Sequence, residues 1–111
     1  MNKEKFREDV MKLLWKAEHL LYRKGHDYGD EDRLRNFKHV SKMWSILTGK
    51  EMTPTEAALF LLLLKIDRYM NLYKKGEEAL NESVEDTVVD GVNYWLLMEA
   101  NRKDEGGRID A

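Results

Sequence analysis

Apolar residues recur every three or four positions along most of the chain, and no stretch alternates strictly between apolar and polar residues. This spacing is typical of amphipathic helices and argues against strands. The pattern predicts an all-α protein with four helices, at about residues 3–23, 31–48, 54–75 and 83–101. Because the connections are short, neighbouring helices should be antiparallel, which gives an antiparallel four-helix bundle.

Glycines and capping residues mark where these helices should begin and end. Gly25, Gly49 and Gly76 are expected to close the first three helices. The segment 53–56 places threonine at the N-cap, proline at the first helical position and glutamate where it closes a capping box. The expected N-caps of the second and fourth helices are Asp30 and Ser83.

Some of the predicted helices have apolar faces wider than a single stripe of an amphipathic helix. Residues 57–64 are apolar on every side, which predicts a segment buried at the centre of the bundle or of an oligomer. The first helix has a second apolar stripe, which indicates either a wide core face or contact with another subunit. The fourth helix has a predicted core stripe of Val84, Val88, Val92 and Trp95. The other two tryptophans, Trp15 and Trp44, are also expected in the core.

The length and the net charge of the chain narrow the classes of protein to which it can belong. The 111 residues fit one domain, expected over residues 1–102 with a polar tail at 103–111. A net charge of −2 lacks the basic excess of a general nucleic-acid binder, so direct binding to nucleic acid is not expected. The absence of cysteine excludes disulfides and thiolate metal sites. The longest apolar run is well short of the ~20 residues that span a bilayer, so we expect a cytoplasmic protein without a membrane partner.

The fourth helix carries an unusual row of polar residues. Glu82, Asp86, Asp90 and Asn93 are four, four and three positions apart, so they share one helix face, with Glu85 at its edge. Like charges at this spacing repel one another and require compensation. That compensation can come from a hard cation such as Mg²⁺ or from basic side chains of a neighbouring helix.

The third helix offers such basic side chains. Lys65 and Arg68 lie on one face just after the apolar run, and antiparallel packing brings them beside Asp86 and Asp90. A salt bridge from Asp90 to Lys65 or Arg68 explains these residues without a ligand, and the helix dipole explains acidic residues in the first turn of the fourth helix. A metal site and a phosphate site are the alternatives.

Two segments, 65–68 and 82–94, resemble a phage and bacterial family called nucleotide-modification-associated proteins, and segments 24–29, 36–37, 44–45 and 53–54 are also similar to that family. The family is similar to the MazG-like all-α nucleoside triphosphate pyrophosphohydrolases. The resemblance implies a helical bundle that forms a homodimer, with the site beside the interface. It also implies Mg²⁺, or Mn²⁺, and hydrolysis of an NTP or dNTP to the monophosphate and pyrophosphate.

The resemblance assigns roles to particular residues. It implies metal binding by Glu82, Glu85, Asp86 and Asp90, with Asp86 and Asp90 as the catalytic carboxylates. Its implied nucleotide-binding residues are Asn93, Tyr94, Tyr28 and Asn36, and the positive charges of Lys65 and Arg68 add these two residues as candidates for binding phosphate. The family's first acidic pair is missing, because Lys65 and Arg68 stand in its place with only Asp67 between them.

Three hypotheses follow. The leading one is a Mg²⁺-dependent pyrophosphohydrolase-like protein of phage or bacterial nucleotide metabolism. The second is a nucleotide-binding protein without hydrolysis, because Lys65 and Arg68 would bind phosphate directly. The third is a structural helical module for oligomerisation. A helix-turn-helix DNA reader is a weaker fourth, since a recognition helix starting at Thr53 would present leucine and phenylalanine to the major groove.

Overall fold

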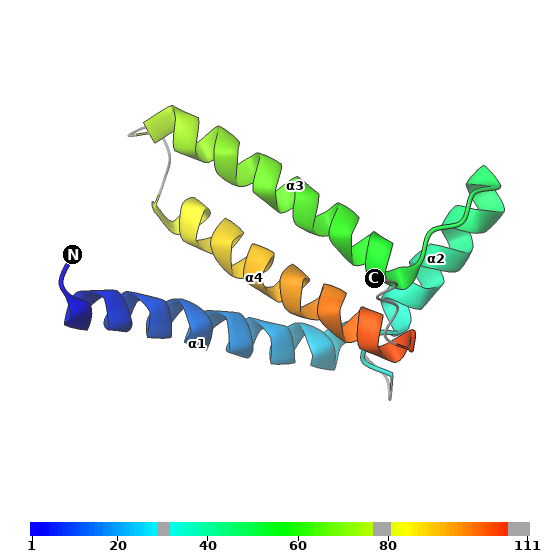
Figure 1. The fold of residues 1–111 in the computed structure, drawn as a ribbon, viewed down its shortest axis with the longest axis horizontal. Coiled ribbons are helices and arrows are strands. Elements are labelled where there is room, and N and C mark those ends of the chain that lie inside the picture. Colours follow the sequence, from blue (N-terminus) through cyan, green and yellow to red (C-terminus); the bar gives the residue numbers. More distant parts are fainter. Residues whose placement is uncertain (29–31, 77–80, 107–111) are drawn as a thin grey trace.

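The computed structural model describes the backbone of residues 1–28, 32–76 and 81–106, and the side chains of residues 1–23, 32–76 and 84–106. This part of the chain forms four helices and no strand (Figure 1), which confirms the predicted all-α class. The helices are α1 (Lys3–Tyr28), α2 (Arg35–Thr48), α3 (Pro54–Lys75) and α4 (Asn81–Asp104).

The start of α3 follows its sequence signal. The Thr53 hydroxyl accepts a hydrogen bond from the backbone N–H of Glu56 at 3.1 Å, and the Glu56 carboxylate accepts one from the backbone N–H of Thr53 at 3.0 Å. This capping box is confirmed. Gly49 ends α2 in the left-handed conformation with φ of 71°, and Gly76 ends α3, as predicted.

Three predicted boundaries are wrong. Helix α1 continues through Gly25 to Tyr28, because a single glycine lowers helix propensity without forcing the chain out of the helix. Helix α4 begins at Asn81, before Ser83, and continues to Asp104. Helix α2 begins only at Arg35. Its expected cap, Asp30, lies outside the described residues.

The helices do not form a regular up-and-down bundle. Helices α3 and α4 lie side by side and antiparallel, and α1 lies along α4 in the same general direction as α4 (Figure 1). Helix α2 contacts α3 but stands away from the pair at a large angle. The space between α2 and the α3–α4 pair is where the functional site must be sought.

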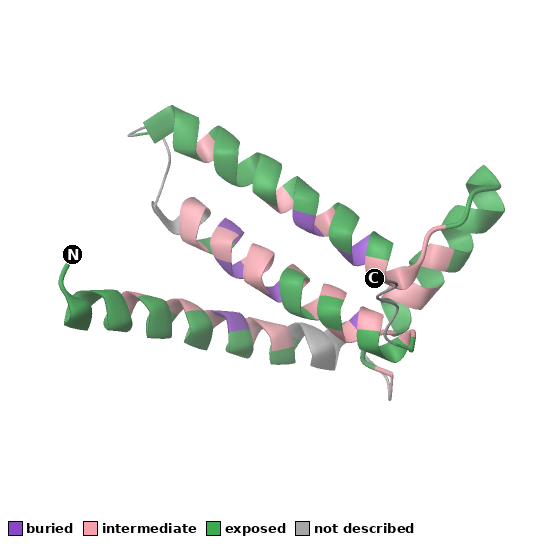
Figure 2. Ribbon diagram, viewed as in Figure 1, coloured by how far each residue is buried: buried purple, intermediate pink, exposed green. Residues whose placement is uncertain are grey.

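Few large side chains are buried (Figure 2). The buried apolar residues lie where α1, α3 and α4 face one another, and they are Ala17, Ala57, Ala58, Leu62 and Val89. The predicted burial of the whole segment 57–64 within this chain is therefore wrong, since four of its residues are exposed. Trp15, Trp44 and Trp95 are exposed as well, contrary to prediction.

The predicted core stripe of α4 is also wrong. Val88 and Val92 are only half-buried and Trp95 is exposed, whereas Val89, Thr87 and Asn93 are buried. The reason is that α4 lies between α1 and α3, so its covered faces are those that meet these two helices.

None of the described helices has an apolar stretch long enough to cross a bilayer.

Candidate functional site

A cavity of about 480 Å³ lies between α2 and the α3–α4 pair. Its volume falls in the range of about 300–1,000 Å³ that is usual for small-molecule sites. Four of the residues predicted to bind nucleotide or metal reach this cavity, namely Asn36, Asp90, Asn93 and Tyr94. The other lining residues are Leu21, Arg33, Phe37, Val40, Trp44, Met52, Ala57, Phe60, Leu61 and Leu97.

Aromatic side chains from three helices meet at this cavity. Phe37 and Trp44 come from α2, Phe60 from α3 and Tyr94 from α4. Phe37 and Trp44 belong to an apolar stripe at helical spacing on α2, the helix that stands away from the α3–α4 pair, and this stripe faces the cavity. Aromatic walls of this kind suit planar ligands such as nucleobases.

The polar side of the cavity is supplied mainly by α4. Asp90, Asn93, Tyr94 and Leu97 are spaced at i, i+3, i+4 and i+7, so they share one helix face. Arg33 adds a positive charge, and its Nη2 donates a hydrogen bond of 2.6 Å to the carbonyl oxygen of Leu21. Among the residues that the structure describes, the charged groups that line the cavity are thus one carboxylate and one guanidinium.

Asn93 is the most constrained of these side chains. It is 6 % exposed, and its Nδ2 donates a hydrogen bond of 3.0 Å to the carbonyl oxygen of Ala17 on α1. This contact fixes the amide orientation, because the flipped amide would bring two oxygens together. The buried Oδ1 then has no hydrogen-bond partner among the described residues. Leaving a buried acceptor unsatisfied costs roughly 1–3 kcal/mol.

Asp90 is also held from the neighbouring helix. Its Oδ2 lies 3.1 Å from the Lys65 Nζ, and the two side chains are 21 % and 30 % exposed. The salt bridge between Asp90 and Lys65 that the sequence offered as an alternative is therefore present. Asp90 lines the large cavity, whereas Lys65 lines a smaller hollow of about 190 Å³ on the other flank of the α3–α4 pair.

Two other acidic residues of this row, Glu85 and Asp86, do not line the cavity with Asp90. Glu85 accepts a hydrogen bond of 2.7 Å from Lys16 on α1, and this bond holds the pKa of Glu85 below its usual value. Asp86 is exposed. Among the side chains that the structure describes, no three His, Asp or Glu residues come together in a group that could hold a metal ion.

The two basic residues of α3 do not line the cavity either. Arg68 donates through its Nε to the Thr87 hydroxyl at 3.2 Å, and neither Arg68 nor Lys65 is among the residues that line the large cavity. The predicted position of these residues beside the turn of α4 that holds Asp86 and Asp90 is nevertheless confirmed, because Lys65 pairs with Asp90 and Arg68 bonds to Thr87. The side chains of Tyr28 and Glu82 lie outside the described residues.

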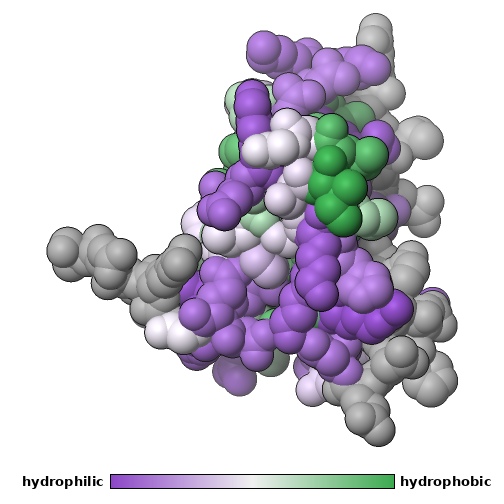
Figure 3. Space-filling view, turned by 90° about the vertical axis from the view of Figure 1, so that its right-hand side faces the viewer, coloured by the Kyte–Doolittle hydropathy of each residue, from purple (hydrophilic) through white to green (hydrophobic). Residues whose placement is uncertain are grey.

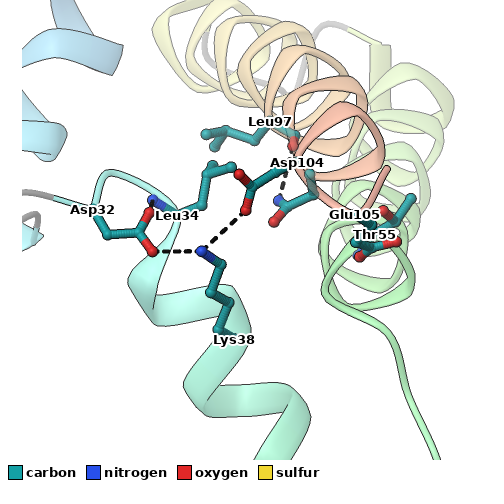
Figure 4. A network of polar contacts seen from close by, with 8 residues as sticks. Asp32, Leu34, Lys38, Thr55, Leu97, Asp104 and Glu105 are labelled. Carbon is teal, nitrogen blue, oxygen red and sulfur yellow. Dashed lines mark hydrogen bonds and ion pairs between the residues drawn. The ribbon is translucent and has the colours of Figure 1, made fainter. Parts of the chain in front are cut away.

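A second polar cluster fixes α2 at the end of the cavity (Figure 4). Lys38 on α2 forms ion pairs with Asp32 and, at 3.0 Å, with Asp104 at the end of α4. These contacts raise the pKa of Lys38 and lower that of Asp32. At the same end, the backbone N–H of Thr55 donates to the Glu105 carboxylate at 2.9 Å.

Several residues of the site were missed by sequence reasoning. Arg33, Phe37, Trp44 and Phe60 line the cavity, but none had been assigned a binding role. All three aromatic residues lie on apolar segments, which are equally typical of a core. Phe37 and Trp44 also lie in segments 36–37 and 44–45, which resemble the family, but the resemblance had not been used to assign them a role. Arg33 belongs to the segment before α2 and had no motif around it.

Two comparisons with known proteins give matches. Residues 12–102 match the family model described as a domain of unknown function, DUF6378. The chain is also 31 % identical over 100 residues to the Gene 55 protein of Mycobacterium phage L5, a match that covers 88 % of this chain and 57 % of that protein. The chain thus spans little more than half the length of this relative. No solved structure matches. Together the two matches point to a phage-associated family.

Proposed function

The chain belongs to the DUF6378 family, and on that premise we propose that it is a nucleotide-binding protein whose ligand occupies the cavity between α2 and the α3–α4 pair. One observation carries this proposal. A cavity of about 480 Å³ brings the aromatic residues Phe37, Trp44 and Phe60 together with the charged residues Arg33 and Asp90. A ligand that suits this lining has a planar group for the aromatic rings and polar groups for the two charged side chains.

A nucleotide meets these requirements. Stacking of a base on an aromatic side chain is worth about 1–3 kcal/mol and tolerates any base, and Trp44, Phe37 and Phe60 offer such surfaces. A ring N–H, an exocyclic amino group or a sugar hydroxyl can donate a hydrogen bond to the carboxylate of Asp90, which lines the cavity. Arg33 supplies the cavity's cationic side chain, which suits a phosphate.

Binding is better supported than hydrolysis. Mg²⁺ prefers several oxygen ligands, often including carboxylates, but Asp90 is paired with Lys65 and Glu85 with Lys16. The described residues therefore do not by themselves fit the metal, and no catalytic step is derived through it. Pyrophosphohydrolase activity, a MazG-like relationship and a homodimer remain predictions, supported by the sequence resemblance.

The test is a ligand panel on the whole chain. We expect at least one of the four NTPs, the four dNTPs or the corresponding monophosphates to raise the melting temperature and to give saturable binding in calorimetry. Trp44→Ala should weaken that binding by at least tenfold, because the base loses a stacking surface. Ile46→Ala is the matched control, since Ile46 lies on the same helix, is 82 % exposed and does not line the cavity.

Two results would overturn the proposal. One is an unchanged melting temperature across the whole panel, with and without Mg²⁺. The other is equal affinity of wild type and Trp44→Ala for every ligand that binds.

Product analysis separates binding from turnover. Each triphosphate is incubated with Mg²⁺ or Mn²⁺, and the monophosphate and pyrophosphate are measured. Turnover that Asp90→Asn abolishes supports the pyrophosphohydrolase prediction, whereas binding without product supports a nucleotide-binding protein alone.

A further inference from the structure

The chain exposes more surface than a compact protein of its mass. Its accessible surface is 9000 Å², against roughly 6,400 Å² expected for a compact monomer of this mass. Its radius of gyration is 16.3 Å, against about 13 Å for a compact domain of this length. Figure 3, seen from the side on which α2 stands, shows a hydrophobic patch on this surface beside hydrophilic residues. The described helices therefore leave a large apolar surface uncovered.

One exposed apolar stripe has a regular repeat. We call it the α3 seam, and it consists of Leu59, Leu63, Ile66, Met70 and Tyr73. Its residues are four, three, four and three positions apart, and each is between 40 % and 70 % exposed. This is the heptad spacing by which one helix packs along another. The α3 seam runs through residues 57–64, the apolar segment that is only partly buried within this chain.

A glycine lies beside the α3 seam. Gly91 is inside α4 and lines the smaller hollow together with Ile66 of the α3 seam and with Trp95. Glycine is disfavoured within helices relative to alanine. Among the described residues nothing requires it, because a Cβ at position 91 would meet nothing within 4 Å. The missing side chain leaves a notch in an apolar face that the described side chains do not fill.

We propose that a second copy of this chain packs on the α3 seam and inserts a side chain into the notch at Gly91. A two-fold dimer brings the same surface of both copies together, so each α3 seam covers the other. The five seam residues and Trp95 expose on the order of 600 Å², which approaches the ~800 Å² that each partner of a stable complex contributes. This dimer differs from the one that the family resemblance implies, which has its site beside the interface, because the cavity lies on the opposite flank from the α3 seam. The inference therefore does not rest on the nucleotide proposal.

The first experiment measures mass. Analytical ultracentrifugation of the full chain at 1–100 μM should give twice the monomer mass of 13.2 kDa at the upper end of this range. Ile66→Lys should shift the protein to monomer, because it places a charge in the middle of the α3 seam. Ile46→Lys is the matched control, since Ile46 is exposed on α2 and lies off the seam. A monomeric wild type, or equal effects of the two variants, would overturn the proposal.

The second experiment uses the notch and does not depend on charge. Gly91→Leu should weaken dimerisation by at least tenfold, because the leucine fills the space that the second copy needs. In the monomer the new side chain starts in open space, so helix content by circular dichroism should be unchanged or higher. An unchanged dimer dissociation constant for Gly91→Leu would contradict the insertion at Gly91. Nucleotide binding serves as a separate readout, since its failure in wild type would leave the dimer result intact.

Discussion

The two flanks of the α3–α4 pair carry opposite kinds of surface. One flank faces α1 and α2 and presents Asp90, Asn93 and Tyr94 to a cavity. In the part of the chain that the structure describes, the other flank presents Gly91, Trp95 and the α3 seam, with Lys65 and Thr87 beside them. On α4, Asp90, Asn93 and Tyr94 thus lie on the sheltered flank, and Val88, Val92 and Trp95 lie on the open one.

This arrangement is the reverse of what a lone helical bundle needs, because burial stabilises apolar groups and penalises unsatisfied polar ones. It is consistent with a chain in which the sheltered flank serves a ligand and the open flank serves assembly. The comparison also predicts that mutations on the two flanks have separable effects, and that changes at their shared centre affect both.

The largest effect is expected at the shared centre. Leu62 is 2 % exposed, and Leu62→Ala should lower the free energy of unfolding by about 2–5 kcal/mol. Urea unfolding followed by circular dichroism measures this loss. Leu64→Ala is the control on the same helix, where a half-exposed side chain should cost much less. Similar losses for both variants would show that the centre of α3 is not the core of the molecule.

An intermediate effect is expected from the salt bridge that joins the flanks. A double-mutant cycle with Lys65→Met and Asp90→Asn should give a coupling free energy of about 1–2 kcal/mol, because the partly buried pair lies between exposed and fully buried cases. The exposed pair of Lys5 and Asp9, at 3.0 Å, is the control and should show little coupling. Coupling no larger than in the control would mean that the two flanks are not linked through Asp90.

The smallest effect is a pH dependence confined to the sheltered flank. The hydrogen bond from Lys16 lowers the pKa of Glu85 in the folded chain, so its stabilisation is present above the unfolded-state pKa of Glu85. That stabilisation is lost as the pH falls through the folded-state pKa. Between pH 7 and pH 3, the melting temperature of wild type should therefore fall slightly more than that of Lys16→Met. If the melting temperatures of the two proteins fall in parallel with pH, the contact between Lys16 and Glu85 does not stabilise the fold.

Local features of the fold were predictable from the sequence, whereas its long-range contacts were not. The capping box at Thr53 and the end of α2 at Gly49 depend on neighbouring residues, so both were predicted correctly. The pairing of Lys38 with Asp104 joins residues 66 positions apart and left no periodic signal. The apolar stripes of α3 and α4 were visible, but their spacing does not tell whether the same chain or another one covers them.

The candidate site was predictable in part for the same reason. Asp90, Asn93 and Tyr94 share a helix face, which helical spacing alone indicates. The contribution of Trp44 and Arg33 depends on the angle at which α2 leaves the α3–α4 pair, and no residue pattern encodes that angle. The sequence also could not decide among the partners of Lys65, because a salt bridge, a metal site and a phosphate site all suit the same charges.

The ion pairs of Lys38 make the wall of the cavity sensitive to the ionic medium. They are exposed, and the Debye length falls from about 10 Å in 0.1 M salt to about 3 Å in 1 M salt. Concentrated salt should therefore weaken these ion pairs of α2 and leave the apolar contact of α3 with α4 in place. The position of α2, and with it the opening of the cavity, should thus respond to the salt concentration of the solution.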